Sequence, residues 1–120
     1  MPKILYIEDD PNNRRLVQRI LMASDWECDT AENALDGIKM AQQDPPDLIL
    51  MDISMPEMDG LTATAEIRSI PTIAKVPVIA LTANAMQGDR ELALSAGCDG
   101  YISKPINIDT FVEEITKFLG

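Results

Sequence analysis

The segment Pro46–Gly60 reads PDLILMDISMPEMDG and joins a run of apolar residues to a charged end. The run Leu48–Met51 is bounded by proline before it and a Pro- and Gly-containing loop after it. This pattern is typical of a strand buried on both faces of a parallel sheet. Asp52 follows directly, and an ionised carboxylate partly removed from water costs free energy unless something compensates its charge. The segment therefore predicts a central strand whose final carboxylate has a structural or a chemical role.

Strand and helix signals alternate along the whole chain. The other predicted strands are residues 3–7, 27–31, 76–81 and 100–103, and helical patterns run from about residues 11, 33, 60, 86 and 107. Pro11 suits a first helical turn, Asn33 and Asn107 are predicted helix caps, and Gly97 is a predicted left-handed helix end. The alternation predicts an α/β fold over residues 1–120 as one domain. We expect a doubly wound, flavodoxin-like parallel sheet of five strands in the order 2-1-3-4-5, with five helices and right-handed crossovers.

Composition excludes several classes of protein. The chain has 120 residues, of which 46% are hydrophobic, so it can form an ordinary globular core. No apolar stretch is long enough for a membrane span, and the first predicted strand leaves no room for a signal peptide. The net charge of −10 opposes binding to nucleic acid backbones. Cys28 and Cys98 are expected to be idle thiols in a reducing cytoplasm.

Polar residues follow four of the predicted strands. They are Glu8, Asp9 and Asp10 after the first strand, Asp52 at the end of the third, Thr82 at the end of the fourth and Lys104 after the fifth. Ligands of open α/β sheets bind beyond the carboxyl ends of the strands, where the strand order reverses. The order 2-1-3-4-5 places that point between the first and third strands. We therefore expect these side chains to meet at one edge of the sheet.

The residue types at this edge indicate phosphoryl chemistry. Two like charges 4 Å apart repel by roughly 4 kcal/mol at an effective dielectric of ~20, and a divalent cation relieves that repulsion. A site of carboxylates and waters suits Mg²⁺ or Mn²⁺. Lys104 and the Thr82 hydroxyl can bind phosphate oxygens. Asp52 is then the group that could attack phosphorus and form an aspartyl-phosphate.

Each residue also has a plainer structural interpretation. Asp10 is expected to cap the first helix, and Asp59-Gly60 is expected to be only a turn. Lys104 could form a structural salt bridge, and Thr82 could be an ordinary hydroxyl at a strand end. The convergence of acids, hydroxyl and lysine on one edge favours the chemical interpretation.

At these positions the sequence resembles the receiver domain of two-component response regulators. The resemblance covers essentially the whole chain and rests on residues 7–10 (IEDD), 47–56 (DLILMDISMP) with 59–60 (DG), 80–83 (ALTA) and 96–105 (AGCDGYISKP). It implies that Asp52 is the phosphoacceptor and, with Asp9, a Mg²⁺ ligand, that Glu8 acts through water, and that the Ser54 backbone carbonyl completes the protein ligands. Glu8 departs from the commoner Asp, which could change metal affinity.

The resemblance also implies how the signal is passed on. Lys104 would bind the phosphoryl group, and Thr82 and Tyr101 would form a switch pair that alters the surface of the fourth helix, fifth strand and fifth helix. The chain has no histidine, so the donor would be a partner phosphohistidine on a histidine kinase or a histidine phosphotransfer protein. The recipient would be a downstream protein target. Such a chain is a signalling domain that catalyses its own phosphorylation and dephosphorylation, either stand-alone or part of a hybrid kinase.

Three other functions have sequence features against them. A haloacid-dehalogenase-like phosphohydrolase would have a second aspartate where this chain has Ser54. A flavodoxin-type electron carrier needs a Ser/Thr/Gly-rich phosphate loop, whereas residues 8–10 are acidic and would repel flavin phosphate. A degenerate receiver that serves only for docking would usually lack Asp52, Lys104 or an acidic partner, and this chain retains all of them.

Overall fold

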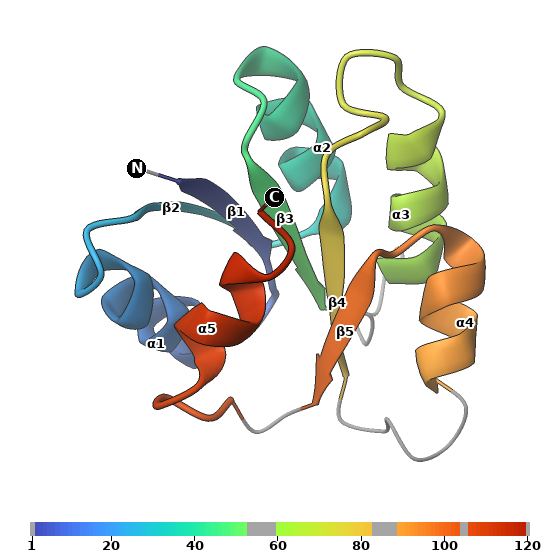
Figure 1. Ribbon diagram of the computed structural model, residues 1–120. Coiled ribbons are helices and arrows are strands. Elements are labelled where there is room, and N and C mark those ends of the chain that lie inside the picture. Colours follow the sequence, from blue (N-terminus) through green and yellow to red (C-terminus); the bar gives the residue numbers. More distant parts are fainter. Residues whose placement is uncertain (1, 53–59, 83–88, 104–105, 120) are drawn as a thin grey trace.

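A computed structural model describes residues 2–52, 60–82, 89–103 and 106–119. Its parallel sheet has the strand order β2-β1-β3-β4-β5, as predicted (Figure 1). The strands are β1 (Lys3–Ile7), β2 (Glu27–Ala31), β3 (Leu48–Asp52), β4 (Val78–Thr82) and β5 (Gly100–Ser103). The helices are α1 (Pro11–Met22), α2 (Ala34–Gln43), α3 (Gly60–Arg68), α4 (Asp89–Ala96) and α5 (Phe111–Thr116). None of the described helices combines the length and apolar composition that crossing a bilayer would require.

Helices cover both faces of the sheet. In Figure 1, α1 and α5 lie on one face, and α2, α3 and α4 lie on the other. Successive strand residues point to opposite faces, so Ile4 and Tyr6 of β1 pack under α1 and α5, whereas Leu5 and Ile7 pack under α2 and α3. Every residue of β3 is buried, which confirms the prediction of a two-sided central strand.

The two cysteines lie on opposite faces of this sheet. Cys28 packs beside the buried residues under α1 and α5, which we call the α1–α5 cluster: Ile4, Tyr6, Val17, Leu21, Leu48, Leu50, Ile79, Leu81, Ile102, Phe111 and Ile115. Cys98 lies within the buried cluster under α2, α3 and α4. Both are free thiols, as predicted. Burial raises the pKa of both, and that of Cys28 reaches about 12.

Most predicted helix ends are confirmed. Asp10 is the N-cap of α1, and its side chain accepts a hydrogen bond of 2.8 Å from the Asn12 backbone N–H. Asn33 caps α2 in the same way, accepting from the Asp36 N–H at 2.8 Å. Gly97 follows α4 with φ +109°, the left-handed conformation that glycine adopts without strain.

The predicted cap of the last helix is wrong. Its N-cap is Thr110, and α5 begins at Phe111. Asn107 instead accepts a hydrogen bond from the Asp109 backbone N–H at 3.0 Å, which forms a turn before the helix. Asparagine stabilises such turns through the same short amide that caps helices, so the sequence alone favoured the wrong one of two local structures.

Candidate functional site

Three carboxylates meet at the carboxyl ends of β1 and β3. Ile7 pairs with Met51 in the strand register, so Glu8 and Asp52 are the next residues along the two neighbouring strands. One carboxylate oxygen from each of Glu8, Asp9 and Asp52 lies within 4.8 Å of the others. Glu8 is 1% exposed and Asp52 2%, whereas Asp9 is exposed to solvent. We call these three residues the acidic cluster, and their convergence was predicted from the sequence.

The acidic cluster has the composition of a divalent cation site. Ionised carboxylates at this separation repel one another, most strongly where burial removes the screening effect of water. Oxygen ligands, two of them buried and one open to solvent, suit a hard cation that keeps several waters, such as Mg²⁺ or Mn²⁺. The residues present therefore fit the metal that the sequence predicted.

Glu8 is held by groups that the sequence interpretation had not identified. Its Oε1 accepts hydrogen bonds from the Tyr6 hydroxyl at 2.9 Å and from Asn13 Nδ2 at 3.2 Å. Its backbone carbonyl accepts from Arg14 Nη1 at 2.7 Å, and its N–H donates to the Ala31 carbonyl at 3.0 Å. One signal was present in the sequence, because Tyr6 and Glu8 are two residues apart along a strand and so share a face.

Tyr6 is fully buried in the α1–α5 cluster. Burial, followed by the nearby charges of Glu8, Asp52 and Asp10, raises the pKa of the Tyr6 hydroxyl well above its ordinary value. The hydroxyl consequently stays protonated and acts as a hydrogen-bond donor toward Glu8.

Thr82 and Tyr101 lie on the same side of the sheet. Asp52 pairs with Leu81, so the buried Thr82 is one residue further along β4 at the same end of the sheet as the acidic cluster. Tyr101 pairs with Ala80, which shares its face with Thr82 by strand alternation. Tyr101 is partly buried against the cluster under α2, α3 and α4. Thr82 itself pairs with Ser103, so the two residues of the predicted switch pair lie two register positions apart on the same face of neighbouring strands.

Two predicted site residues, Ser54 and Lys104, lie outside the described residues. Asp59, which the sequence assigned to a turn, lies outside them as well. Their roles remain predictions from the sequence.

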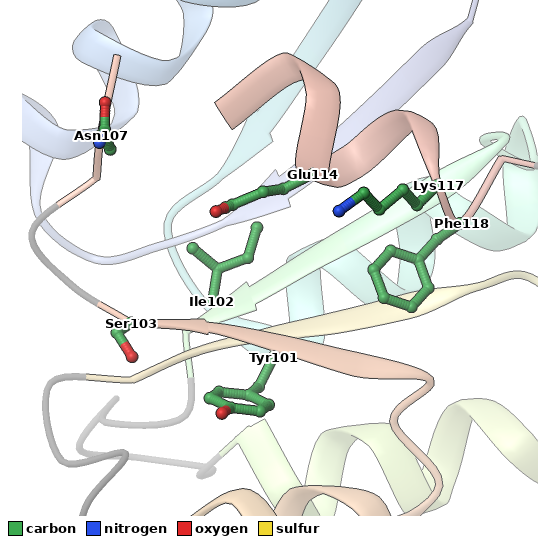
Figure 2. A pocket seen from close by; sticks show the side chains of 7 residues that line it. All are labelled: Tyr101, Ile102, Ser103, Asn107, Glu114, Lys117 and Phe118. Atoms are coloured by element: carbon green, nitrogen blue, oxygen red, sulfur yellow. The ribbon is translucent and has the colours of Figure 1, made fainter. Parts of the chain in front are cut away.

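A groove of about 400 Å³ opens between β5 and α5. Figure 2 shows its lining residues, which are Tyr101, Ile102, Ser103, Asn107, Glu114, Lys117 and Phe118. Phe118 lies so close to β5 that a Cβ on Gly100 would come within 2.4 Å of its ring, so this approach requires glycine. The groove forms part of the surface that the sequence predicted to change on phosphorylation.

The five-stranded sheet of this order, with an acidic cluster between its first and third strands, is what the resemblance to response regulator receiver domains predicted. Residues 4–116 match the family described as "Response regulator receiver domain". The chain belongs to this family and is therefore a signalling domain of two-component systems.

Individual relatives agree with this assignment. The chain is 41% identical to the polar-differentiation response regulator DivK of Brucella anthropi, over 100% of this chain and 98% of that protein. It is 35% identical to the receiver domain of a sensor histidine kinase from Pseudomonas aeruginosa, solved with a magnesium ion coordinated in the active site cleft. That match has a TM-score of 0.91 and covers 99% of this chain and 98% of the other. The chemotaxis protein CheY4 of Vibrio cholerae, at 24% identity and 98% coverage of both chains, shares the fold with a TM-score of 0.93.

Proposed function

We propose that residues 1–120 form one receiver domain that acts as a phosphoacceptor switch, with Asp52 as the phosphorylated residue. The observation that supports this most directly is the burial of Asp52, 2% exposed, beside two further carboxylates. A buried anion among anions destabilises the fold, so a chemical role accounts for it better than a structural one.

The proposed step is a transfer between two side chains. A carboxylate oxygen of Asp52 attacks the phosphorus of a phosphohistidine, and an O–P bond forms while the P–N bond breaks. The electron pair of the P–N bond returns to the imidazole nitrogen, which can then take up a proton. Since the chain contains no histidine, the donor is a partner, either a histidine kinase or a histidine phosphotransfer protein.

Mg²⁺ is the proposed cofactor, and Mn²⁺ would serve as well. Asp9 and Asp52 would bind it directly, Glu8 through water, and the Ser54 backbone carbonyl would complete the protein ligands. The bound cation would supply positive charge next to the phosphoryl oxygens. The Pseudomonas aeruginosa relative, with its magnesium ion in the active site cleft, supports this assignment.

The output of the switch is a changed protein surface. Lys104 binds the phosphoryl group, the Thr82 hydroxyl moves toward it, and Tyr101 turns inward. These movements alter the surface of α4, β5 and α5, which includes the groove in Figure 2. A downstream protein that recognises this surface is the proposed target.

We further propose that the domain works in the cytoplasm and binds neither nucleic acid nor membrane directly. Its net charge of −10 opposes contact with phosphate backbones and anionic lipid surfaces. Its only reactions would be its own phosphorylation and dephosphorylation, so we class it as a signalling domain and not as an enzyme.

Intact-protein mass spectrometry tests the phosphoacceptor. After incubation with acetyl phosphate and Mg²⁺ we expect one phosphoryl adduct, and we expect none without Mg²⁺ or in Asp52→Asn. Asp47→Asn is a matched control, because it removes an exposed carboxylate and keeps an acceptor for the Lys3 backbone N–H. Stable labelling of Asp52→Asn would contradict the proposal. No adduct in the wild type, with no spectroscopic response to beryllium fluoride, would indicate a docking module instead.

A further inference from the structure

Glu8 is a buried carboxylate whose orientation is fixed by two hydrogen bonds to one oxygen. The Tyr6 hydroxyl donates to Oε1 from β1 at 2.9 Å, and Asn13 Nδ2 donates to the same oxygen from α1 at 3.2 Å. Glu8 is 1% exposed and Tyr6 0%. Charge-assisted hydrogen bonds are stronger than neutral ones, so the two donors restrict the side-chain conformations that Glu8 can adopt.

Glutamate needs such restriction more than aspartate does. Its extra methylene adds a rotatable bond, and ordering that bond for metal binding costs conformational entropy. A side chain that is already ordered in the metal-free protein does not lose this entropy when the metal binds. The donors therefore compensate for the longer side chain at this position.

Tyr6 is the more rigid of the two donors. Its ring lies in the α1–α5 cluster among Ile4, Leu50 and Ile79, all fully buried. Residues two apart on a strand share a face and are separated by roughly 6.6 Å, a distance that a tyrosine side chain spans. Core packing thus determines where the hydroxyl lies relative to the acidic cluster.

We propose that Tyr6, assisted by Asn13, is a positioning residue that holds Glu8 ready for a divalent cation bound by the acidic cluster. The inference rests on the proposed function, because it requires a metal at this site. It adds a role for a core tyrosine that touches neither the metal nor the phosphoryl group and acts only through Glu8.

Direct metal titration tests the role of Tyr6. We would measure Mg²⁺ binding by isothermal titration calorimetry, and Mn²⁺ binding from the electron paramagnetic resonance signal of free Mn²⁺. Tyr6→Phe keeps the ring and removes the hydroxyl. We expect Kd for both ions to rise about tenfold, the lower end of the range for a lost hydrogen bond around a metal site, because Glu8 itself acts through water. An unchanged Kd would overturn the proposal.

Ile4→Val is the matched control for packing. Ile4 lies on the same strand and in the same cluster as Tyr6 and is fully buried. The substitution removes one methylene from the core and no hydrogen bond, so the protein should lose stability while Kd stays within twofold of wild type. If Ile4→Val weakened metal binding as much as Tyr6→Phe, the effect would be one of general stability and the proposal would fail.

A double-mutant cycle tests whether Tyr6 acts through Glu8. Glu8→Asp shortens the side chain by a methylene and removes its reach to the Tyr6 hydroxyl. On that background we expect Tyr6→Phe to change Kd by less than twofold. A tenfold loss on both backgrounds would show that Tyr6 acts independently of Glu8 and would overturn the proposal.

The outcomes also separate this inference from the proposed function. If the wild type bound neither Mg²⁺ nor Mn²⁺, the metal site and the positioning role would both be wrong. If the wild type bound metal and Tyr6→Phe bound it equally well, only the positioning role would be wrong. If circular dichroism showed that Tyr6→Phe does not fold, Asn13→Ala would be tested instead. It removes the second donor to Oε1, and an unchanged Kd would again overturn the proposal.

Discussion

The two ends of the sheet differ in how charged side chains are arranged: opposite charges pair at the amino end, and like charges gather at the carboxyl end. At the amino end of β4, Arg68 donates hydrogen bonds to the carbonyls of Gly97 at 2.9 Å, Ala74 at 3.0 Å and Val76 at 2.6 Å. Its Nη2 also pairs with Asp99 Oδ2 at 2.7 Å. One cation thus ties the end of α3 to the segments that lead into β4 and β5.

At the carboxyl end, three carboxylates gather within 4.8 Å of one another. The amino end stabilises the fold because opposite charges meet there and the same cation also donates to three carbonyls. The carboxyl end concentrates like charges, in a cluster whose composition fits a divalent cation. The amino end of this domain therefore contributes stability, whereas the carboxyl end holds like charges whose repulsion opposes it.

The largest predicted effect is at the amino end. Arg68→Ala leaves three carbonyls and the Asp99 carboxylate without the donor described above. Asp99 is 47% exposed and Arg68 24%, so water weakens the ion pair itself, and most of the loss comes from the hydrogen bonds to the carbonyls. We expect the free energy of unfolding to fall by about 3 kcal/mol, as measured by urea denaturation.

Arg15→Ala is the control, because Arg15 is an exposed arginine on α1 and should change stability by no more than about 0.5 kcal/mol. The five-residue strands separate the two ends by roughly 15 Å, so Arg68→Ala should leave the stabilisation by Mg²⁺ unchanged. Loss of that stabilisation would contradict the division of roles between the two ends.

An opposite and smaller effect is predicted at the carboxyl end. Asp52→Asn removes one negative charge from the acidic cluster, and the mutual repulsion there falls. We expect the metal-free variant to be more stable than wild type by about 1 kcal/mol, only part of the Coulomb repulsion, since the amide keeps a single acceptor oxygen. Thermal unfolding in the presence of EDTA measures this difference.

Glu27→Gln provides the matched control for charge. It also neutralises one carboxylate, but Glu27 is an exposed residue of the edge strand β2, so its effect should stay within about 0.5 kcal/mol. If both variants were stabilised equally, the increase in the free energy of unfolding would come from the change in net charge and not from the acidic cluster. If Asp52→Asn were less stable than wild type, repulsion within the acidic cluster would not destabilise the metal-free protein, and the two ends would not differ in this way.

The sequence predicted the acidic cluster because strand ends are local signals and the order of strands follows from a general rule for α/β sheets. Glu8, Asp9 and Asp52 follow apolar strands, and the doubly wound order alone brings such ends together. Arg68 and Asp99 are 31 positions apart, and their contact depends on how α3 packs beside the segment after α4. Periodicity carries no information about such a contact.

At two positions the local sequence also did not predict the backbone conformation. Asp25 adopts φ 62° after α1, although glycine is the usual residue there, because the chain turns back to form β2. Asn107 was predicted as a cap and forms a turn instead. The side chains of Asn and Asp can form hydrogen bonds with the nearby backbone in more than one conformation, and tertiary packing decides which conformation is adopted.

A further predicted effect depends on pH and concerns Cys28, a half-buried neutral group on the edge strand β2. Burial and, to a smaller extent, Asp29 raise the pKa of Cys28 from 9.0 to about 12. The folded protein therefore holds this proton more tightly than the unfolded chain does. The resulting contribution to stability is complete below pH 9 and is lost as the pH rises from 9 toward 12.

Cys28→Ala removes this titration, while the contributions of Cys98 and Tyr6 to the pH dependence are the same in both proteins. From pH 9 to 12 the free energy of unfolding of the wild type should therefore fall more steeply than that of Cys28→Ala. The difference in slope cannot exceed that of one proton, about 1.4 kcal/mol per pH unit. Urea denaturation at several pH values compares the two slopes. Parallel curves would mean that ionising the half-buried Cys28 costs little, and the contribution assigned to its raised pKa would then be wrong.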